Sequence, residues 1–209
     1  MSDAVDEEHD PEVPVALLQE RAVYEEHDPA LGRRLWGRQL DPEHDTDLLT
    51  HWMNKPHVAE FWDMAWPRDW IYDYLKRHEE DPDRTTYLGF LDDRPIGYME
   101  VYDPFHDVLG QHAPLLPGDI GAHVLIGDED QLGRSSVAFG FAVNRYLFAK
   151  PGVHRIVGEP DVRHHNFLSL LAFLGYRKHQ ELDLPDKTAA FMVCERRDFE
   201  RLSSRRRRR

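Results

Sequence analysis

The sequence contains a single cysteine, Cys194, among its 209 residues. One cysteine cannot form a disulfide within the chain, which fits a reducing compartment, so we expect a cytoplasmic protein with Cys194 as a core residue of a late strand. The sequence also lacks a run of the roughly 20 apolar residues that a membrane-spanning helix requires. Its first residues, MSDAVDEEHD, lack the apolar centre of a secretory signal. These absences predict a protein without a membrane partner.

Basic residues are also few, with 26 Lys and Arg against 39 Asp and Glu and a formal net charge of −13. An acidic surface repels phosphate backbones, and no basic face with interleaved aromatic residues is present, so we expect no nucleic-acid partner. The histidines are scattered and show no HxxxH spacing, and CxxC is absent, so we predict no metal site. Whether the protein is a monomer or a dimer stays open.

The length suits one α/β domain with tails. Residues 1–30 are rich in acids and are expected to form a mobile extension, residues 31–198 the domain, and residues 199–209 a solvated arginine-rich tail. Within the domain the predicted order is β-α-α-β-β-β-α-β-α-β-β. The predicted strands are 33–40, 86–91, 94–102, 119–126, 154–160, 177–185 and 188–197, and the predicted helices 47–54, 68–79, 133–150 and 165–175.

Turn residues support several of these boundaries. Asp45 or Thr46 can cap the first helix, and Pro56 is expected to stop it. The pair Asp92-Asp93 between two strand patterns indicates a hairpin, and Gly175 closes the last predicted helix.

The strand at 119–126 leads into the helix at 133–150 through a turn containing glycine, arginine and serine. Such a turn leaves backbone N–H groups free at the helix N-terminus, which together with the helix dipole can bind an anion. A plain helix cap is the alternative explanation. The residues of the candidate phosphate turn are Gly133, Arg134, Ser135 and Ser136.

This turn resembles the pyrophosphate loop of the GNAT acyl-CoA N-acyltransferases, in which a Gln or Arg, two residues, Gly, one residue and a Gly or Ala follow one another. Here Asp130 stands at the first position and Ser135 at the last, so the pattern is degenerate. We therefore expect phosphate binding to depend more on Arg134.

Four blocks carry a narrower resemblance, to the siderophore-biosynthesis acyltransferases. They are HWMNKPHVAEFWDMAWP (51–67), GYMEVYDPFHD (97–107), GDIGAHVLIGD (118–128) and VGEPDVRHHN (157–166). The resemblance implies the α/β GNAT fold, a mixed and mostly antiparallel sheet flanked by helices, with a splay between the fourth and fifth strands. It also implies acyl-CoA, acetyl or succinyl, as co-substrate.

The function implied by this resemblance is acyl transfer to an N-hydroxylated amine, giving the hydroxamate of a siderophore. The acceptor stays open among N-hydroxycadaverine, N-hydroxyputrescine, a hydroxylated diaminopropane and N6-hydroxylysine. Two alternatives are a GNAT enzyme for another amine (a polyamine, an aminoglycoside or a protein amino terminus) and a CoA-binding module without catalysis.

The candidate catalytic residues are His123 and Glu159. His123 interrupts the apolar strand IGAHVLI, where an imidazole can accept a proton or, alternatively, be a core histidine bonded to a carbonyl. Glu159 and Asp161 project to the same side of a strand unless Pro160 breaks the alternation. By resemblance Glu159 is the acidic partner of His123, and Asp161 a helix cap or substrate contact.

The remaining candidates surround the expected acyl and acceptor sites. By resemblance, the residues 124–126 line the acyl-pantetheine, and Asn166 lies near it or caps its helix. Glu100 lies among aromatic residues, where a carboxylate needs a partner such as a cationic acceptor, unless the strand face is exposed. His57 and Trp62, from the two-helix region, and His106, with Asp107 in the long loop 103–119, are further acceptor contacts. The predicted acyl-CoA wall consists of Val124, Leu125 and Ile126.

Overall fold

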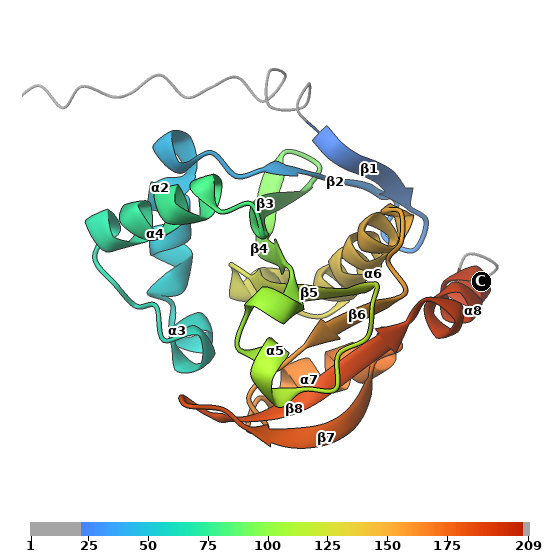
Figure 1. Cartoon of the computed structure of the whole chain (residues 1–209). Coiled ribbons are helices and arrows are strands. Elements are labelled where there is room, and N and C mark those ends of the chain that lie inside the picture. The colour runs from blue at the N-terminus through green and yellow to red at the C-terminus, as the bar shows by residue number, and fades with distance from the viewer. Residues whose placement is uncertain (1–21, 207–209) are drawn as a thin grey trace, which may run out of the picture.

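The computed structural model describes residues 22–206, which form a mixed eight-stranded sheet with helices on both faces (Figure 1). The strands are β1 Ala22–Asp28, β2 Arg33–Gln39, β3 Arg84–Leu91, β4 Arg94–Tyr102, β5 Asp119–Ile126, β6 Arg155–Gly158, β7 Arg177–Asp183 and β8 Thr188–Glu195. The helices are α2 Pro42–Met53, α3 Pro56–Trp62, α4 Arg68–Glu80, α5 Leu109–His112, α6 Arg134–Ala149, α7 His165–Phe173 and α8 Arg196–Arg206, with the 3-10 turns η1 Pro104–His106 and η2 Glu129–Gln131.

The strand order is β1-β2-β3-β4-β5-β6-β8-β7, and neighbours are antiparallel except for the parallel pair β5 and β6. This parallel pairing is short, joining residues 119–121 to residues 155–157. Beyond Gly121, β5 continues to Ile126 paired with β4, whereas β6 ends at Gly158. The predicted splay is confirmed, between the strands labelled β5 and β6.

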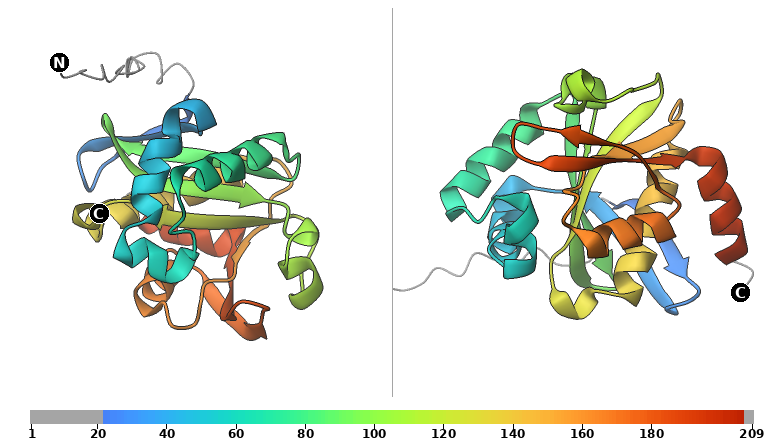
Figure 2. Two further views of the ribbon diagram at one scale, coloured as in Figure 1. Left: turned by 90° about the vertical axis from the view of Figure 1, so that its left-hand side faces the viewer. Right: turned by 90° about the horizontal axis from the view of Figure 1, so that it is seen from below.

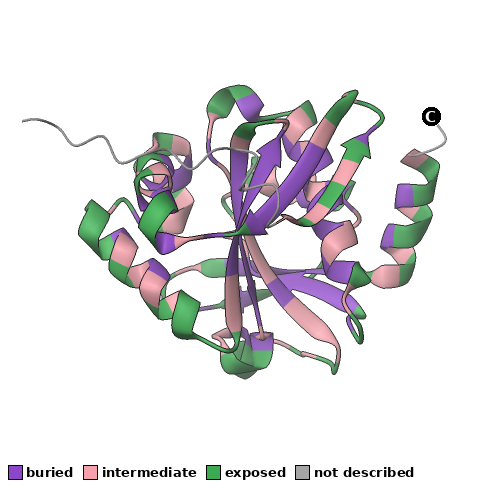
Figure 3. Ribbon diagram, turned by 90° about the horizontal axis from the view of Figure 1, so that it is seen from above, coloured by how far each residue is buried: buried purple, intermediate pink, exposed green. Residues whose placement is uncertain are grey.

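Apolar residues pack on both faces of the sheet. Helices α2, α3 and α4 lie on one side, and α6 and α7 on the other (Figure 2). Buried residues concentrate in the strands and in the helix faces turned toward them (Figure 3). Phe139 of α6 lies against Gly89 and Gly97, where a Cβ atom would overlap its ring. Its burial stabilises the fold by roughly 2 kcal/mol.

The first helix begins earlier than the sequence predicts. Pro42 occupies its first turn, and the N-cap is Asp41, whose side chain accepts a 3.0 Å hydrogen bond from the amide of Glu43. Asp45 is buried instead in an ion pair with Arg38, at 2.6 Å. Pro56 does not merely stop this helix; it opens α3, because a proline fits the first helical position.

Both expected tails are more ordered than predicted. Residues 22–28 belong to β1, an edge strand paired with β2, and the arginine-rich segment continues α8 through Arg206. Arg206 donates a 2.8 Å hydrogen bond to Asp28, and Arg145 of α6 binds Glu26 through its Nε at 2.6 Å. The pair of Asp28 and Arg206 therefore joins the two segments, and the pair of Glu26 and Arg145 holds β1 on α6. The expectations for 1–21 and 207–209 fall outside the described residues.

Other expectations of detail hold. The hairpin at Asp92-Asp93 joins β3 to β4, and Cys194 is buried in β8. Within residues 22–206 no helix combines the length and apolarity needed to cross a bilayer.

Candidate active site

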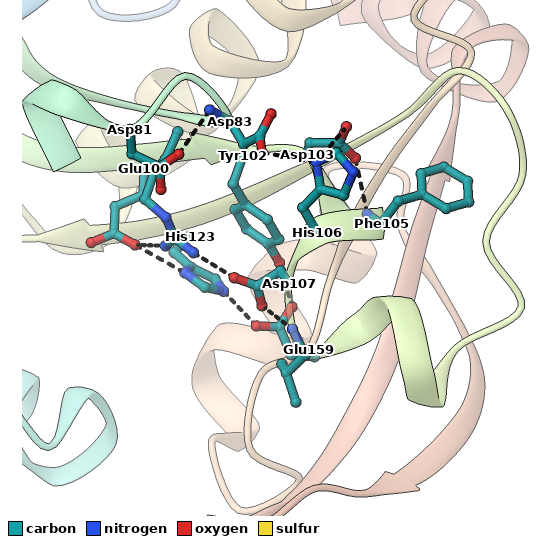
Figure 4. A network of polar contacts seen from close by, with 12 residues as sticks. Asp81, Asp83, Glu100, Tyr102, Asp103, Phe105, His106, Asp107, His123 and Glu159 are labelled. Atoms are coloured by element: carbon teal, nitrogen blue, oxygen red, sulfur yellow. Dashed lines mark hydrogen bonds and ion pairs between the residues drawn. The ribbon is translucent and has the colours of Figure 1, made fainter. Parts of the chain in front are cut away.

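The imidazole of His123 lies between two carboxylates at the start of the splay (Figure 4). His123 on β5 and Glu100 on β4 are directly opposite in the antiparallel register, so their side chains share one face of the sheet. His123 Nδ1 lies 3.2 Å from Glu100 Oε2. On the other side, His123 Nε2 contacts Oε1 of Glu159, which follows the last residue of β6. The predicted pairing of His123 with Glu159 is present, and Glu100 completes a triad.

Burial makes these charges interdependent. Glu100 and Glu159 are 1% and 3% exposed, while the side chain of His123 is 28% exposed. Burial by itself disfavours the imidazolium, but the attraction of Glu159 and hydrogen bonds to both carboxylates outweigh it and raise the pKa of His123 to about 10. For the two carboxylates the effects have the opposite sign. Burial raises the pKa of each, but the interaction with His123 outweighs it and lowers both to about 2. His123 is therefore cationic at neutral pH in the free protein.

Each carboxylate has further donors. Glu100 Oε1 accepts hydrogen bonds from Tyr74 at 2.5 Å and Tyr98 at 2.8 Å, and its Oε2 accepts from Arg84 at 2.8 Å. The cation that Glu100 needs is thus supplied by the chain itself, in Arg84, and its strand face is not exposed. A contact between Glu100 and the acceptor stays a prediction.

Glu159 is held by the hydroxyl of Tyr102, which donates to its Oε2 at 2.7 Å. Burial and the nearby carboxylate raise the pKa of Tyr102 well above its ordinary value, so the phenol keeps its proton and remains a donor. Arg84 lies over the ring of Tyr102, 5.0 Å from its centroid, and also binds Asp107. The predicted Asp107 therefore joins the network through Arg84.

Sequence reasoning missed Arg84 and the hydroxyls of Tyr74, Tyr98 and Tyr102 as partners. The alternation in GYMEVY does place Tyr98, Glu100 and Tyr102 on one face, and a carboxylate between two phenols is a usable signal. Arg84 has no comparable local signal, because it reaches Glu100 only through the pairing of β3 with β4.

Asp161 lies apart from this network. Its carboxylate accepts hydrogen bonds from the backbone and guanidinium of Arg163, so it shapes the turn before α7. It does not cap that helix, whose N-cap is His164, and a contact with the substrate stays a prediction. Asn166 is exposed at the second position of α7, and the N-cap is His164. The capping role considered for Asn166 is therefore wrong, because the helix begins one residue before it, and its place near pantetheine stays a prediction.

The aromatic and histidine candidates separate into three places. Trp62 of α3 lies edge-on to His123, with ring centroids 6.1 Å apart, and so borders the triad. His57 Nε2 lies 3.1 Å from the carbonyl oxygen of Ile126, at the far end of β5. His106 is exposed and pairs with Asp83 at 2.8 Å. The structure therefore brings only Trp62 of these three against His123.

One exposed group in the described part of the chain has the donor atoms of a metal site. The side chains of Asp83, Asp103 and His106 place one ligand atom each within 4.8 Å of one another. Exposed acidic groups of this kind are common without an ion, and His106 already pairs with Asp83. We assign no metal to it.

The backbone of β5 offers hydrogen-bond groups to the splay. The amide of Gly127 donates to Ile96 of β4 at 3.0 Å, which fixes the alternation of the antiparallel ladder. It follows that the amides of His123 and Leu125 point toward β4, whereas those of Val124 and Ile126 point away from it, where β6 no longer pairs. Of the predicted wall, Val124 and Ile126 therefore present backbone N–H groups to the gap, and the Leu125 side chain packs among α2 and α4.

The candidate phosphate turn is built around Gly133, which has a φ of 93° and precedes α6 as its N-cap. The Ser136 hydroxyl accepts from the amide of Gly133 at 3.0 Å and donates to its carbonyl at 2.8 Å, which fixes the turn. Arg134 is exposed and Ser135 half-buried. The Ser136 side chain thus shapes the turn rather than projecting from it.

Acidic residues beside this turn are neutralised. Asp130, which stands where the GNAT motif has Gln or Arg, binds Arg94 at 2.7 Å. Asp128 binds Lys55 at 2.5 Å and Arg94 at 3.0 Å. The pKa of Asp128 is lowered, first by its hydrogen bond with Lys55, so it remains an anion paired with cations. These pairs reduce the repulsion that a phosphate would otherwise meet.

Several proteins of known activity are similar to this chain. It is 32% identical over 179 residues to the N(6)-hydroxylysine O-acetyltransferase of Escherichia coli and 32% identical over 181 residues to the hydroxyornithine transacylase SID3 of Ajellomyces capsulatus. Each match covers 85% of the chain but only 57% and 41% of the relative. The N-hydroxyputrescine acetyltransferase of Acinetobacter baumannii is 28% identical, with 74% of each chain covered.

Solved structures show the same fold. An uncharacterized protein of Bacillus halodurans superposes with a TM-score of 0.84 and 28% identity, covering 88% of this chain and 96% of that one. An aminoglycoside acetyltransferase in complex with coenzyme A and kanamycin superposes with a TM-score of 0.72 and 26% identity, covering 80% and 98%. Residues 41–184 match the family described as the acetyltransferase (GNAT) domain. The splayed sheet, the glycine turn before α6 and this match together show that the chain belongs to the GNAT acetyltransferases.

Proposed function

We propose that this protein is an acyl-CoA-dependent N-acyltransferase of hydroxamate siderophore biosynthesis. It transfers acetyl or a similar short acyl group, such as succinyl, to an N-hydroxylated diamine or N6-hydroxylysine. The observation that carries the proposal is the His123 imidazole, held between Glu100 and Glu159 where β5 leaves β6. The relatives named for hydroxylysine, hydroxyornithine and N-hydroxyputrescine support the acceptor class.

The thioester would lie in the splay with the phosphates toward the turn before α6. The amide of Val124, which points into the splay, is suited to stabilise the oxyanion as the carbonyl is attacked. At the other end, Gly133 and Arg134 offer backbone N–H groups and a positive charge to the pyrophosphate. Acyl-CoA is thus bound by backbone groups at two places, which accommodates the departure from the loop motif.

The acceptor nitrogen attacks the thioester carbonyl; the C–N bond forms and the C–S bond breaks. A hydroxylamine is less basic than an alkylamine and is largely neutral at physiological pH, so its nitrogen needs no prior deprotonation. The proton lost by nitrogen and the proton gained by the thiolate balance, and the His123–Glu159 pair can relay them. The imidazolium of His123 donates its proton to the leaving sulfur, and the neutral ring then takes the proton that the nitrogen loses. Glu159, which is buried and bound by His123 and Tyr102, stays ionised and compensates the charge of the imidazolium.

A second acceptor class has its own support. The chain is 28% identical over 172 residues to the aminoglycoside N(6')-acetyltransferase type 1 of Klebsiella pneumoniae, with 86% of that protein covered. An acidic surface also suits polycationic acceptors. A plain alkylammonium acceptor, however, must lose a proton before it attacks, and a His123 that is already cationic is a poor base for that step. This favours the hydroxylamine.

The test is thiol release from acetyl-CoA and succinyl-CoA with cadaverine, putrescine, diaminopropane, lysine and ornithine, each with and without N-hydroxylation. Kanamycin and spermidine serve as the alternative acceptors. Turnover confined to hydroxylamines supports the proposal, and turnover with kanamycin or spermidine alone contradicts it.

The product must be identified as well, because the Escherichia coli relative is named for transfer to oxygen. A hydroxamate formed by N-acylation gives a coloured complex with ferric iron, whereas an O-acyl hydroxylamine does not present the same chelating pair of oxygens. Colour that develops in step with thiol release identifies transfer to nitrogen.

A further inference from the structure

Arg84, the first residue of β3, binds Glu100 directly and contacts Tyr102, the residue that holds Glu159. Its Nη1 donates to Glu100 Oε2 at 2.8 Å, the same oxygen that faces His123 Nδ1. Its guanidinium also lies 5.0 Å from the ring centroid of Tyr102, whose hydroxyl binds Glu159. Arg84 is thus linked to both arms of the triad, to Glu100 directly and to Glu159 through Tyr102.

The second terminal nitrogen of Arg84 binds Asp107 in the segment between β4 and β5. The Arg84 side chain is 15% exposed and that of Asp107 18%, so the pair is weakly screened by water. Asp107 Oδ1 also accepts from the amide of Val108 at 2.7 Å, which anchors the carboxylate to its loop. The bidentate fork of an arginine can bind two carboxylates in fixed directions, which a lysine cannot do.

We infer that Arg84 is a positioning residue of the reaction: it fixes Glu100 and Tyr102 around His123 and ties them to Asp107 on the loop between β4 and β5. The inference rests on the proposed function in taking His123 and Glu159 as the reacting pair. Arg84 has no contact with the acyl group or acceptor in this account and acts through the residues it orients.

The charge of Arg84 also sets how tightly the cluster retains a proton. Without it, less positive charge would compete with the imidazolium for the two buried carboxylates, so His123 would hold its proton more tightly. Without the charge of Asp107, the positive charge of Arg84 would be less compensated and His123 would release its proton more easily. The charged and titratable groups around His123 and its partners are Tyr74 and His78 from α4, Arg84 from β3, Tyr98, Glu100 and Tyr102 from β4, Asp107, Glu159 and Lys187.

The experiment compares Arg84→Gln, Arg84→Lys and Asp107→Asn in steady-state kinetics and in an NMR titration of the histidine side chains. The His123 signal is assigned from its loss in His123→Ala. Arg84→Gln is expected to lower kcat by roughly 10- to 100-fold while KM for acyl-CoA changes by less than about 2-fold, because positioning is lost but binding is not. Arg84→Lys is expected to recover the titration and only part of kcat.

The titration distinguishes positioning from general damage. His123 should deprotonate at higher pH in Arg84→Gln and at lower pH in Asp107→Asn, two opposite shifts that loss of folding cannot produce. Arg33→Gln is the matched control, since it breaks an exposed pair with Asp92 at the far side of the sheet. An Arg84→Gln protein with wild-type kcat and titration would overturn the inference.

The two proposals fail separately. If the wild-type protein turns over none of the acceptors, the proposed function is wrong, and the NMR arms still test the network without substrate. If Arg84→Gln does not fold, Arg84→Lys and Asp107→Asn decide: a wild-type kcat in Arg84→Lys together with a wild-type titration curve in Asp107→Asn would contradict the inference.

Discussion

The hydroxyl of Tyr102 on β4 donates a 2.7 Å hydrogen bond to Glu159 beyond the end of β6, reaching past the intervening strand β5. A Cβ atom on Gly121 of β5 would overlap the ring of Tyr102, so the glycine leaves the room for this reach. The hydrogen bond thus depends on the position of β5 between β4 and β6 and on glycine at position 121.

Tyr102→Phe removes this donor and leaves the lone pair of a buried carboxylate unsatisfied. Glu159 should then bind a proton more readily, and we expect kcat to fall about 10-fold with little change in KM for acyl-CoA. Steady-state kinetics check this, with Tyr146→Phe as control, because the Tyr146 hydroxyl donates a hydrogen bond to Tyr87 and not to a residue of the triad. Equal kcat for both variants would contradict the role.

The pair His123 and Glu159 should behave as one unit. His123→Ala and Glu159→Gln are each expected to lower kcat by roughly 100-fold or more, and the double variant by about as much as either, because each change disables the same relay. Single-turnover measurements of all three variants test this. If the fold-losses in kcat of the two single variants multiply in the double variant, the two residues act independently. Full turnover by the double variant would exclude a catalytic role for both.

The triad also makes stability depend on pH. His123 has a pKa of about 10 in the folded chain against 6.5 ordinarily, so its contribution is complete below pH 6.5 and is lost as pH rises toward 10. Glu100 and Glu159 have pKa values of about 2 against 4.5, so their contribution is complete above pH 4.5 and is lost as pH falls toward 2. The cluster therefore stabilises the fold most between pH 4.5 and 6.5.

Urea unfolding of the wild-type and His123→Ala proteins across pH measures this contribution. The difference in unfolding free energy is expected to be largest near pH 5 to 6.5 and to shrink as the wild-type imidazolium loses its proton toward pH 10. A difference that stays constant over that range would show that His123 is neutral in the folded protein.

Asp28→Asn tests the docking of α8 on β1. Asp28 is 1% exposed and accepts hydrogen bonds from the amides of Ala30 and Leu31 and from Arg206. Loss of its charge should lower the free energy of unfolding by about 1 to 3 kcal/mol, because the partly buried guanidinium of Arg206 loses its charged partner. Thermal unfolding measures it, and Glu25→Gln, at an exposed pair with Arg34, should change little. A loss no greater than that of Glu25→Gln would contradict the docking.

Gly133→Ala tests the phosphate turn. A Cβ atom there meets nothing within 4 Å, so the effect comes from the backbone, whose φ of 93° and ψ of −117° are adopted mainly by glycine and cost other residues roughly 1 to 3 kcal/mol. We expect weaker CoA binding in calorimetry and an unchanged kcat at saturation. Gly152→Ala also places a side chain at a positive φ, of 76°, with open space around it, but beyond the other end of α6, and it should bind CoA normally. Similar affinity for both variants would place the phosphates elsewhere.

Local signals predicted much of the fold. The hairpin at Asp92-Asp93 and the helix before Gly175 follow from turn residues whose conformations depend on their neighbours alone. The resemblance in four blocks predicted the splay and brought His123 together with Glu159. The hairpin and the helix end lie within short segments, whereas the splay and the contact of His123 with Glu159 join residues 36 positions apart and were predicted by the resemblance alone.

What the sequence did not predict depends on distant partners. The acids of β1 looked like those of a mobile extension because the arginines that neutralise them lie 119 and 178 residues further along the chain. The sequence predicts a cationic acceptor as the partner of Glu100. Its actual cationic partner, Arg84, lies on the neighbouring strand, and no spacing pattern in the sequence indicates that contact.

The contact between Asp28 and Arg206 has a consequence for synthesis of the chain. A ribosome delivers β1 among the first elements of the domain and α8 last, so the carboxylate of Asp28 must wait for its guanidinium until almost the whole sheet has been made. During that interval β1 can pair with β2 but is not held by α8. Helix α8 thus stabilises β1 only at the end of synthesis. A nascent chain that stops before α8 would leave the edge strand β1 free to pair with a strand of another chain.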